Sequence, residues 1–292
     1  MINFDIDKRI RDAYEIFNSC HLCPRECGLN RTEGALGYCE MGKDLMVSSF
    51  GPHFGEEPEL SGTKGSGTIF FTGCNLGCCF CQNYEISQLH HGEKSSPEEL
   101  AVIMISLQDK GCHNINLVTP THFTPHIIKA FKLAKEKGLN IPLVHNNSGY
   151  ENVSTLQLFE GIIDIYMPDT KYAENETAYK YAHAPDYPEK MKLALKEMHR
   201  QAGDLVTDKN GLATKGLIIR HLVLPGKTAE TEKIARFIAE EISKDSYFNL
   251  MDQYQPYYNS RLFPEINRRI TRKEYEEAVK SAKKLGLHRG VR

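Results

Sequence analysis

The sequence predicts an α/β fold in which six strand–helix units follow a cysteine-rich N-terminal segment. After about residue 67, short apolar and β-branched runs alternate with longer amphipathic stretches, as strands alternate with helices. Six such repeats imply a parallel sheet, because each crossover helix returns the chain in the same direction. Six is too few for a closed eight-stranded barrel. A curved, open (β/α)6 sheet and a doubly wound sheet both fit the pattern.

The six predicted strands are each bounded by turn formers or by a helix candidate. They cover residues 68–72, 114–118, 141–145, 163–167, 217–224 and 248–254. Helices are expected at 228–243 and 271–285, and one is expected to begin after Ser96, which precedes a first-turn proline and two acids. The span 172–205 is charged and weakly periodic, which indicates a helix preceded by an irregular loop.

Residues 1–60 do not follow this pattern. A short helix is expected at 7–17, and a loop rich in turn formers at 49–58. Four cysteines lie between these two segments. The predicted organisation is therefore a cysteine-rich, metal-binding extension and linker over residues 1–60, followed by one α/β domain over residues 61–292.

Composition limits the classes of partner. The 292 residues contain 36 Lys and Arg against 38 Asp and Glu, a near balance that does not favour nucleic acid or an anionic membrane as a partner. Hydrophobic residues make up 40% of the chain, which disfavours disorder. No secretory signal pattern and no apolar run of about 18 residues is present. The predicted location is the cytoplasm.

Nine cysteines are the most informative feature of the composition, because eight of them lie between Cys20 and Cys81. Disulfide scaffolds are typical of small secreted chains, whereas this chain is large and places its thiols at short intervals. Metal ligation or redox chemistry is the better interpretation.

The second cysteine group directly follows the first predicted strand. Cys74, Cys78 and Cys81 have the spacing C-x3-C-x2-C, with Cys79 as an additional thiol. Structural zinc lacks a fourth ligand at ordinary spacing. Three thiolates on a loop suit a cubane 4Fe-4S cluster instead, because each binds one iron and the fourth iron keeps an open coordination position.

This loop resembles that of the radical S-adenosylmethionine (SAM) superfamily, and the resemblance extends over residues 61–292. It implies an open (β/α)6 partial TIM barrel. Later segments resemble the activating enzymes of glycyl radical enzymes, such as pyruvate formate-lyase activating enzyme, and the general layout is most similar to the pyruvate formate-lyase activating enzyme-like subgroup. Asp169 and Lys171 match a D-x-K motif at a strand end, and Arg220 matches the basic position of a late strand ending in Pro-Gly.

The resemblance implies a mechanism and a set of cofactor contacts. Cys74, Cys78 and Cys81 hold a 4Fe-4S cluster, which binds SAM and reduces it to methionine and a 5′-deoxyadenosyl radical. Phe80 lies against the adenine, Asp169 helps to hold SAM, and Lys171 and Arg220 balance its carboxylate. A flavodoxin or ferredoxin supplies the electron, and a glycyl radical enzyme is the candidate protein substrate. No side chain is assigned as a catalytic residue.

The sequence also departs from the family pattern. A Gly-Gly-Glu motif that binds the SAM amino group is absent, so the carbonyls of Thr119 or Pro120, or the Thr121 hydroxyl, are candidate replacements. Asn146 begins a segment that replaces Asp-Thr-Asn-Gly and can hydrogen-bond a ribose without carrying charge. A late His-x-Leu-Gly is missing. Another protein side chain or a small molecule as acceptor, and a non-catalytic electron carrier, therefore stay open as alternatives.

The first cysteine group supplies four thiols, enough for a closed metal site. Structural zinc, an auxiliary iron–sulfur cluster and reduced thiols without metal are the three interpretations. Three histidines near predicted strand ends either face the cavity or are structural; they are His122, His145 and His221. The four thiols of the first group belong to Cys20, Cys23, Cys27 and Cys39.

Overall fold

A computed structural model describes residues 5–291 and contains one mixed sheet of nine strands. Six strands run parallel to one another in chain order, which confirms the predicted open partial barrel. These strands are β2 (Ser66–Phe71), β4 (Ile115–Val118), β5 (Leu143–Asn147), β6 (Ile165–Pro168), β8 (Ala213–Leu222) and β9 (Tyr247–Met251). Each lies within a few residues of its predicted position.

The register of the parallel strands divides their side chains between two faces. On the outer face, Leu117, Tyr166 and Leu217 belong to one large buried cluster that includes residues of the helices. On the inner face, Val144 and Ile165 belong to a second, smaller cluster with Leu60 of the short helix α2 (Pro58–Ser61). Because side chains alternate along a strand, the two clusters occupy opposite sides of the sheet.

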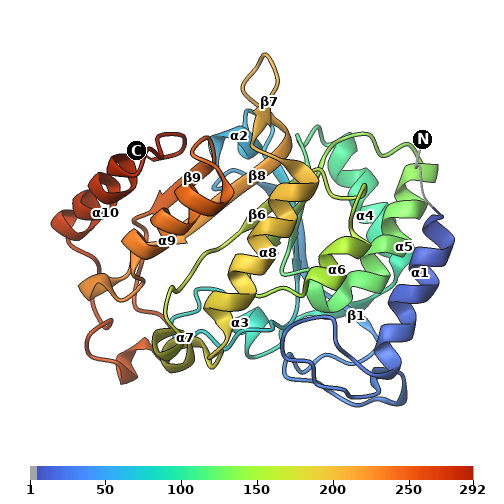
Figure 1. Cartoon of the computed structure of the whole chain (residues 1–292). Coiled ribbons are helices and arrows are strands. Elements are labelled where there is room, and N and C mark those ends of the chain that lie inside the picture. Colours follow the sequence, from blue (N-terminus) through green and yellow to red (C-terminus); the bar gives the residue numbers. More distant parts are fainter. Residues whose placement is uncertain (1–4, 292) are drawn as a thin grey trace.

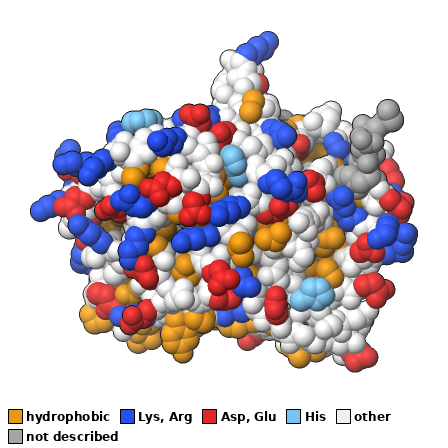
Figure 2. Space-filling view, viewed as in Figure 1, with side chains coloured by type: hydrophobic (Ala, Val, Ile, Leu, Met, Phe, Trp, Pro, Cys, Tyr) orange, Lys and Arg blue, Asp and Glu red, His pale blue; other side chains and the backbone are white. Residues whose placement is uncertain are grey.

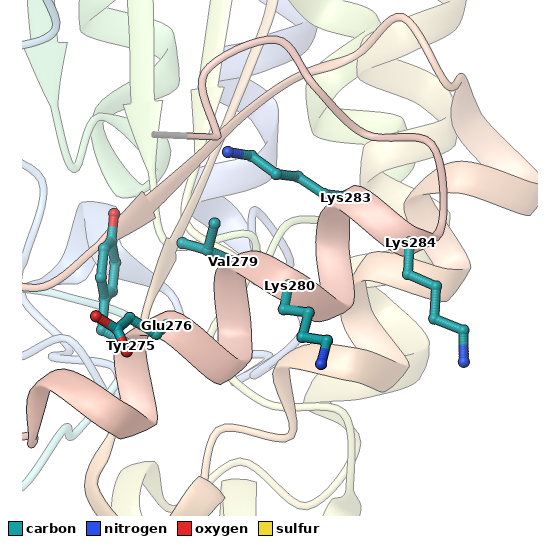
Figure 3. A pocket seen from close by; sticks show the side chains of 6 residues that line it. All are labelled: Tyr275, Glu276, Val279, Lys280, Lys283 and Lys284. Atoms are coloured by element: carbon teal, nitrogen blue, oxygen red, sulfur yellow. The ribbon is translucent and has the colours of Figure 1, made fainter.

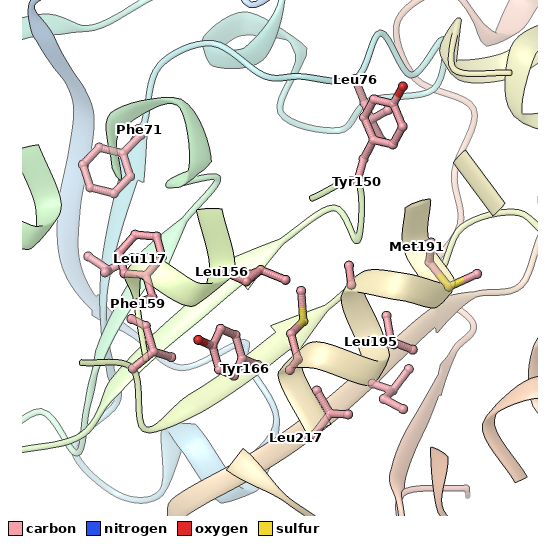
Figure 4. Packing of buried hydrophobic residues seen from close by; sticks show 14 of the residues in the cluster. Phe71, Leu76, Leu117, Tyr150, Leu156, Phe159, Tyr166, Met191, Leu195 and Leu217 are labelled. Carbon is pink, nitrogen blue, oxygen red and sulfur yellow. The ribbon is translucent and has the colours of Figure 1, made fainter. Parts of the chain in front are cut away.

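Helices cover the outer face of the sheet (Figure 1). Figure 4 shows Met191 and Leu195 of α8 packed near Tyr166 and Leu217 of the sheet. The predicted cap of α4 is confirmed, since Ser96 and Glu99 form a reciprocal capping box. The covering helices are α4 (Pro97–Asp109), α5 (Thr124–Glu136), α6 (Val153–Leu158), α8 (Tyr187–Ala202), α9 (Thr231–Phe237) and α10 (Arg272–Lys284).

The loop expected at 49–58 is wrong over its first half, because Leu45–His53 forms strand β1. This strand pairs antiparallel with β2, and its start also pairs with β3 (Glu93–Ser95). Pro52 lies in the part of β1 that pairs on one side only, and proline is tolerated in strands that have such an unpaired edge. The turn-forming residues in this segment therefore predicted a loop where the chain forms a strand.

The span 172–205 also differs from the prediction, since it contains two helices rather than a loop and one helix. The first, α7 (Asn175–Ala182), ends at His183, which has a left-handed backbone conformation with φ of 53°. The second, α8, begins with Pro188 in its first turn. Two helix boundaries close together explain the weak periodicity of this span. In residues 5–291, no helix is both long enough and apolar enough to cross a membrane.

The N-terminal segment is fixed to the domain by a buried arginine. Helix α1 (Ile6–Glu15) packs beside α5, and the cysteine-rich segment follows it. Arg31 is only 1% exposed, and its guanidinium donates hydrogen bonds to the carbonyls of Gly42 and His122. It also lies 4.0 Å from the centroid of the Phe17 ring. Arg31 thus joins the segment to the loop that follows β4.

We expect Arg31→Lys to lower the free energy of unfolding by about 2 kcal/mol, because an ammonium cannot reproduce the planar set of donors that serves two buried carbonyls. Anaerobic urea unfolding followed by circular dichroism measures the loss. Arg261→Lys, on the exposed surface, is the matched control and should change stability by less than about 0.5 kcal/mol. Equal losses in both variants would contradict the role of Arg31.

Candidate active site

A cavity of 380 Å³ lies at the carboxyl ends of the parallel strands. Ligand sites of open α/β sheets form at this edge, because the loops that follow the strands meet there. The predicted cluster cysteines and most of the predicted SAM contacts line this cavity, whereas Pro120 and Thr121 do not. The predicted residues that line it are Cys74, Cys78, Cys81, Phe80, Thr119, Asn146, Asp169, Lys171 and Arg220.

The cysteine loop begins where β2 ends. Gly73 adopts φ of +83°, and a side chain there would lie 2.8 Å from the carbonyl of Cys39. The Cys74 sulfur accepts a hydrogen bond from the backbone N–H of Leu76 at 3.4 Å. The Cys81 sulfur lies 3.1 Å from the Ser87 hydroxyl. Cys79 is buried outside the cavity lining, and its N–H donates to the carbonyl of Tyr181. The loop therefore directs three thiols, and not the fourth, into the cavity.

The electrostatics of these thiols fit an iron–sulfur cluster. Burial raises the pKa of Cys78 to about 11, and the nearby Lys171 ammonium acts against that rise. Burial and the neighbouring Cys78 also raise the pKa of Cys74. Thiolates in such a place need nearby positive charge, which cluster irons supply on binding. Among residues 5–291, no three Cys, His, Asp or Glu side chains are arranged to hold a single metal ion.

A chain of charged side chains crosses the cavity. Lys171 Nζ lies 2.7 Å from one oxygen of Asp169, and Arg220 Nε lies 2.9 Å from the other. Burial alone would raise the pKa of Asp169, but Arg220 and Lys171 outweigh it and hold that pKa at about 2. Arg220 also donates to Asn146 Oδ1 at 2.8 Å. The two predicted cations are therefore fixed by Asp169 on a common wall of the cavity.

Glu56 is a cavity residue that the sequence analysis missed. Its side chain lies 3.2 Å from Arg220 and accepts a hydrogen bond from Asn116 Nδ2 at 3.1 Å. Burial raises its pKa to about 7, although Arg220 acts in the opposite direction. The only signal in the sequence is a pair of adjacent acids, Glu56 and Glu57, in the segment expected to be a loop. Nothing in that pair shows that it reaches the inner face of the sheet.

The structure places three other predicted SAM contacts differently. Phe80 lines the cavity and stacks edge-on against Tyr254, with ring centroids 5.5 Å apart. Thr119, with φ of 60°, also faces the cavity. Thr121 does not line the cavity, so its hydroxyl lies apart from the other residues expected to contact SAM. Its buried hydroxyl donates to Glu151 at 2.7 Å, because a 3-10 turn after β4 directs it away from the cavity.

The three histidines near strand ends are structural. His122 bonds to the carbonyl of Thr72, and His221 bonds to the carbonyl of Thr170. His145 is buried and lies 2.9 Å from the Asn147 amide. Burial lowers the pKa of all three, to about 3 for His122 and His145 and about 4 for His221. They are neutral at physiological pH and lie outside the cavity lining.

The first cysteine group lies next to the cluster loop. Tyr38 N–H donates to the Cys27 sulfur at 3.4 Å, and a Cβ atom added at Gly77 of the loop would lie 2.6 Å from the Tyr38 hydroxyl. Arg25 stacks on the Tyr38 ring at 3.6 Å and donates to the carbonyl of Asn75 at 2.9 Å. The segment that carries four thiols thus directly supports the loop that carries the other three.

A separate hollow lies on the surface beside α10. Its six lining side chains all come from that helix, and three are lysines (Figure 3). Figure 3 shows the side chains of Lys280 and Lys284 extending from the same side of α10. No thiol lines this hollow, and it includes none of the predicted site residues. The cavity at the strand ends is the better candidate for the active site.

Comparison with known proteins agrees with this geometry. The family model described as the radical SAM superfamily matches residues 68–238, more than half of the chain. The chain belongs to the radical SAM superfamily. Its members cleave SAM at an iron–sulfur cluster, and the matched region contains the three cysteines of the cavity.

Individual relatives extend the comparison. The uncharacterized protein MJ0674 of Methanocaldococcus jannaschii is 34% identical over 290 residues, which cover 97% of this chain and 79% of that protein. Among solved structures, the hydrogenase maturase HydG matches 73% of this chain with a TM-score of 0.50 and 15% identity. The chain spans 47% of that HydG chain. A structure of anSMEcpe with bound AdoMet matches at a TM-score of 0.44 and 12% identity, covering 73% of this chain and 55% of its own.

The pair formed by Thr121 and Glu151 predicts a pH effect on stability. Burial raises the pKa of Glu151 to about 8, so the folded chain binds a proton that the unfolded chain releases near pH 4.5. Folding stability therefore falls as the pH rises through this window. Glu151→Gln keeps an acceptor for Thr121 without a charge, so its unfolding free energy should fall less between about pH 6 and pH 8, by roughly 1–3 kcal/mol. The free energy of unfolding is measured by urea unfolding at each pH. An equal fall between pH 6 and pH 8 in wild type and in Glu151→Gln would contradict this prediction.

Proposed function

We propose that this radical SAM protein generates a 5′-deoxyadenosyl radical to activate a glycyl radical enzyme. The observation that carries the chemistry is the convergence of three thiols and a chain of fixed charges on one cavity. In this proposal, Cys74, Cys78 and Cys81 hold the 4Fe-4S cluster. When bound, the cluster and SAM supply one-electron cleavage of a carbon–sulfur bond and hydrogen abstraction from the acceptor.

The remaining lining residues would position SAM. Lys171 and Arg220 are fixed cations that suit its carboxylate, and each can donate hydrogen bonds while staying paired with Asp169. Phe80 offers an aromatic face beside the cysteine loop for the adenine. The backbone of Thr119 and the amide of Asn146 are among the polar groups that line the cavity at the ends of β4 and β5. They take the places where the resemblance leads us to expect amino-group and ribose contacts.

A protein acceptor is supported by the surface around the cavity. Figure 2 shows apolar side chains gathered along the lower edge of the view, below α3 (Tyr84–Ser87) and α7. Tyr257 lines the cavity and is 38% exposed, and Leu89, next to the lining residue Gln88, is 49% exposed. Exposed apolar side chains beside a site favour contact with another protein. The same exposed apolar side chains would also suit a second candidate acceptor, a side chain other than glycine on a partner protein.

The proposal also requires an electron source. We propose a flavodoxin or ferredoxin in the cytoplasm, where thiols stay reduced. The four cysteines of the first group would hold a second metal centre, either zinc or an auxiliary iron–sulfur cluster. A single zinc ion would require these thiols to move closer together, because among residues 5–291 no three such side chains are arranged around one ion. The N–H bond to the Cys27 sulfur supports a metal centre in this group, because such bonds stabilise metal-bound thiolates.

The cleavage chemistry is tested by anaerobic formation of 5′-deoxyadenosine from SAM and dithionite. We expect the cluster-loaded wild type to form 5′-deoxyadenosine. Cys81→Ala should form it at least about 100-fold more slowly, because one iron loses its ligand. Cys112→Ala is the matched control, since Cys112 is buried outside the cavity and its loss should leave the rate within about twofold. Equal rates in all three proteins would contradict the ligand assignment.

The acceptor is tested by electron paramagnetic resonance after incubation with a glycyl radical enzyme. A glycyl radical signal that depends on SAM and on Cys81 supports the activating role. Formation of 5′-deoxyadenosine without that signal, with several such enzymes, would overturn it and favour a different protein side chain or a small molecule.

The second metal centre is tested by metal analysis of the purified protein. Wild type should contain metal beyond one 4Fe-4S cluster, and Cys27→Ser should lose that excess while Cys81→Ala keeps it. Zinc measured by plasma mass spectrometry identifies one alternative, and additional iron with a second Mössbauer component identifies the other. Wild type without metal beyond one 4Fe-4S cluster would leave the reduced-thiol interpretation, and excess metal retained in Cys27→Ser would contradict Cys27 as a ligand.

A further inference from the structure

We infer that Arg31 is the counter-ion of an anionic, thiolate-bound metal centre in the first cysteine group. The inference rests on the second metal centre proposed above. It is independent of SAM binding and of the acceptor, because Arg31 lies outside the lining of the cavity.

The side chain of Arg31 is a buried positive charge. Only 1% of this residue is exposed, and every other Lys and Arg among residues 5–291 is more exposed. A guanidinium stays charged in proteins, and burying a charge without a counter-ion is costly. The fold must therefore place negative charge close to Arg31.

The hydrogen-bond acceptors around Arg31 are neutral. Its Nε and Nη2 donate to the carbonyl of Gly42 at 3.0 and 2.5 Å, and its Nη1 donates to the carbonyl of His122 at 2.7 Å. Among residues 5–291, no Asp or Glu forms an ion pair with Arg31, whereas Arg220 in the cavity pairs with Asp169. The two carbonyls satisfy N–H donors of the guanidinium, but they carry no net charge to balance it.

The thiol of Cys20 is placed to supply the negative charge. Arg31 Nη1 lies 4.0 Å from the Cys20 sulfur. Two backbone hydrogen bonds bring these residues together, since Cys20 N–H donates to the carbonyl of Leu29 at 2.9 Å and Gly28 N–H donates to the carbonyl of Cys20 at 3.0 Å. The chain thus returns past Cys20 immediately before it reaches Arg31.

Metal binding converts this thiol into an anion. A free thiol is mostly neutral at physiological pH, whereas a metal-bound cysteine is a thiolate. Four thiolates around a zinc ion or a 4Fe-4S cluster leave the centre with a net negative charge. Reduced thiols without metal would leave the buried guanidinium uncompensated. The position of Arg31 therefore favours a metal-loaded first group and suits either metal.

Arg31 also connects the first cysteine group to the cluster loop. The carbonyl that it holds belongs to His122, and Nε2 of the same histidine bonds to the carbonyl of Thr72 at 2.7 Å. Thr72 directly precedes Gly73 and Cys74. The counter-ion of the first centre is therefore two hydrogen bonds away from the loop that carries the other three thiols.

The test measures how fast the first centre loses its metal. Anaerobically loaded wild type, Arg31→Gln and Arg31→Lys are mixed with a chelator, and release is followed for the metal that Cys27→Ser lacks. Arg31→Gln should release this metal at least about tenfold faster than wild type, because a cation beside a thiolate stabilises an anionic centre. Arg31→Lys keeps the charge and should stay within about threefold of wild type. Circular dichroism shows whether the variants are folded, and Arg31→Met is a second neutral variant.

The thiolate-to-metal absorption is a readout that a merely structural role would not move. It is recorded on the iron centre, or with cobalt in place of zinc. In Arg31→Gln the band should shift to longer wavelength, because the thiolate electrons lose the stabilising charge, and in Arg31→Lys it should stay in place. Arg261→Gln is the matched control, since it removes the same charge from the exposed surface. It should release metal within about twofold of the wild-type rate, with an unshifted band.

Three outcomes would overturn the inference. Equal acceleration of metal release in Arg31→Gln and Arg31→Lys, with no shift of the band, would leave Arg31 a structural role only. Release from Arg31→Gln at the wild-type rate would show that its charge does not stabilise the centre. Wild type without metal beyond one 4Fe-4S cluster would reject the second centre itself and the inference with it, whereas the first two outcomes leave the second centre in place.

Discussion

The inner face of this sheet depends on the way in which one arginine neutralises buried acids. Arg220 meets Asp169 from the end of β6, Glu56 from the segment after β1, and Asn146 from the end of β5. Each of these carboxylates would be costly to bury without a cation, and the guanidinium provides donors in several directions. The same contacts fix Lys171 through Asp169. The contacts that neutralise the buried acids inside the barrel are therefore the same contacts that position the cations of the proposed cofactor site.

The cysteine-rich segment is an integral support of the site rather than an appendage. Arg25 and Tyr38 contact the cluster loop, Arg31 fixes the segment to the loop after β4, and Gly73 leaves room for the carbonyl of Cys39. Figure 1 shows this segment in blue beside the loops at the lower edge of the sheet. Changes in the first cysteine group would therefore affect the shape of the cluster loop directly.

The six parallel strands and the thiols of the cavity could be predicted because their signals are local. Strand positions follow from apolar runs, and the cluster loop follows from the spacing of Cys74, Cys78 and Cys81. Glu56 and Thr121 could not be placed correctly, since their orientation depends on strand β1 and on a 3-10 turn. In particular, β1 contains turn formers and becomes a strand only by pairing with β2, a contact between distant residues that a local pattern does not contain.

The two edges of the sheet affect how readily the protein aggregates at high concentration. An open barrel leaves two sheet edges, and exposed edges can pair with other molecules. One edge is the three-residue strand β3, where exposed Glu93 and Lys94 place charges and Lys94 pairs with Asp44. The opposite edge is formed by β9 and by the two-residue strand β7 (Val206–Thr207), which both pair with β8. On β9, the N–H of Phe248 donates to the carbonyl of Arg289. Short, charged or covered edges of this kind oppose strand-to-strand aggregation while leaving the barrel open at its cavity.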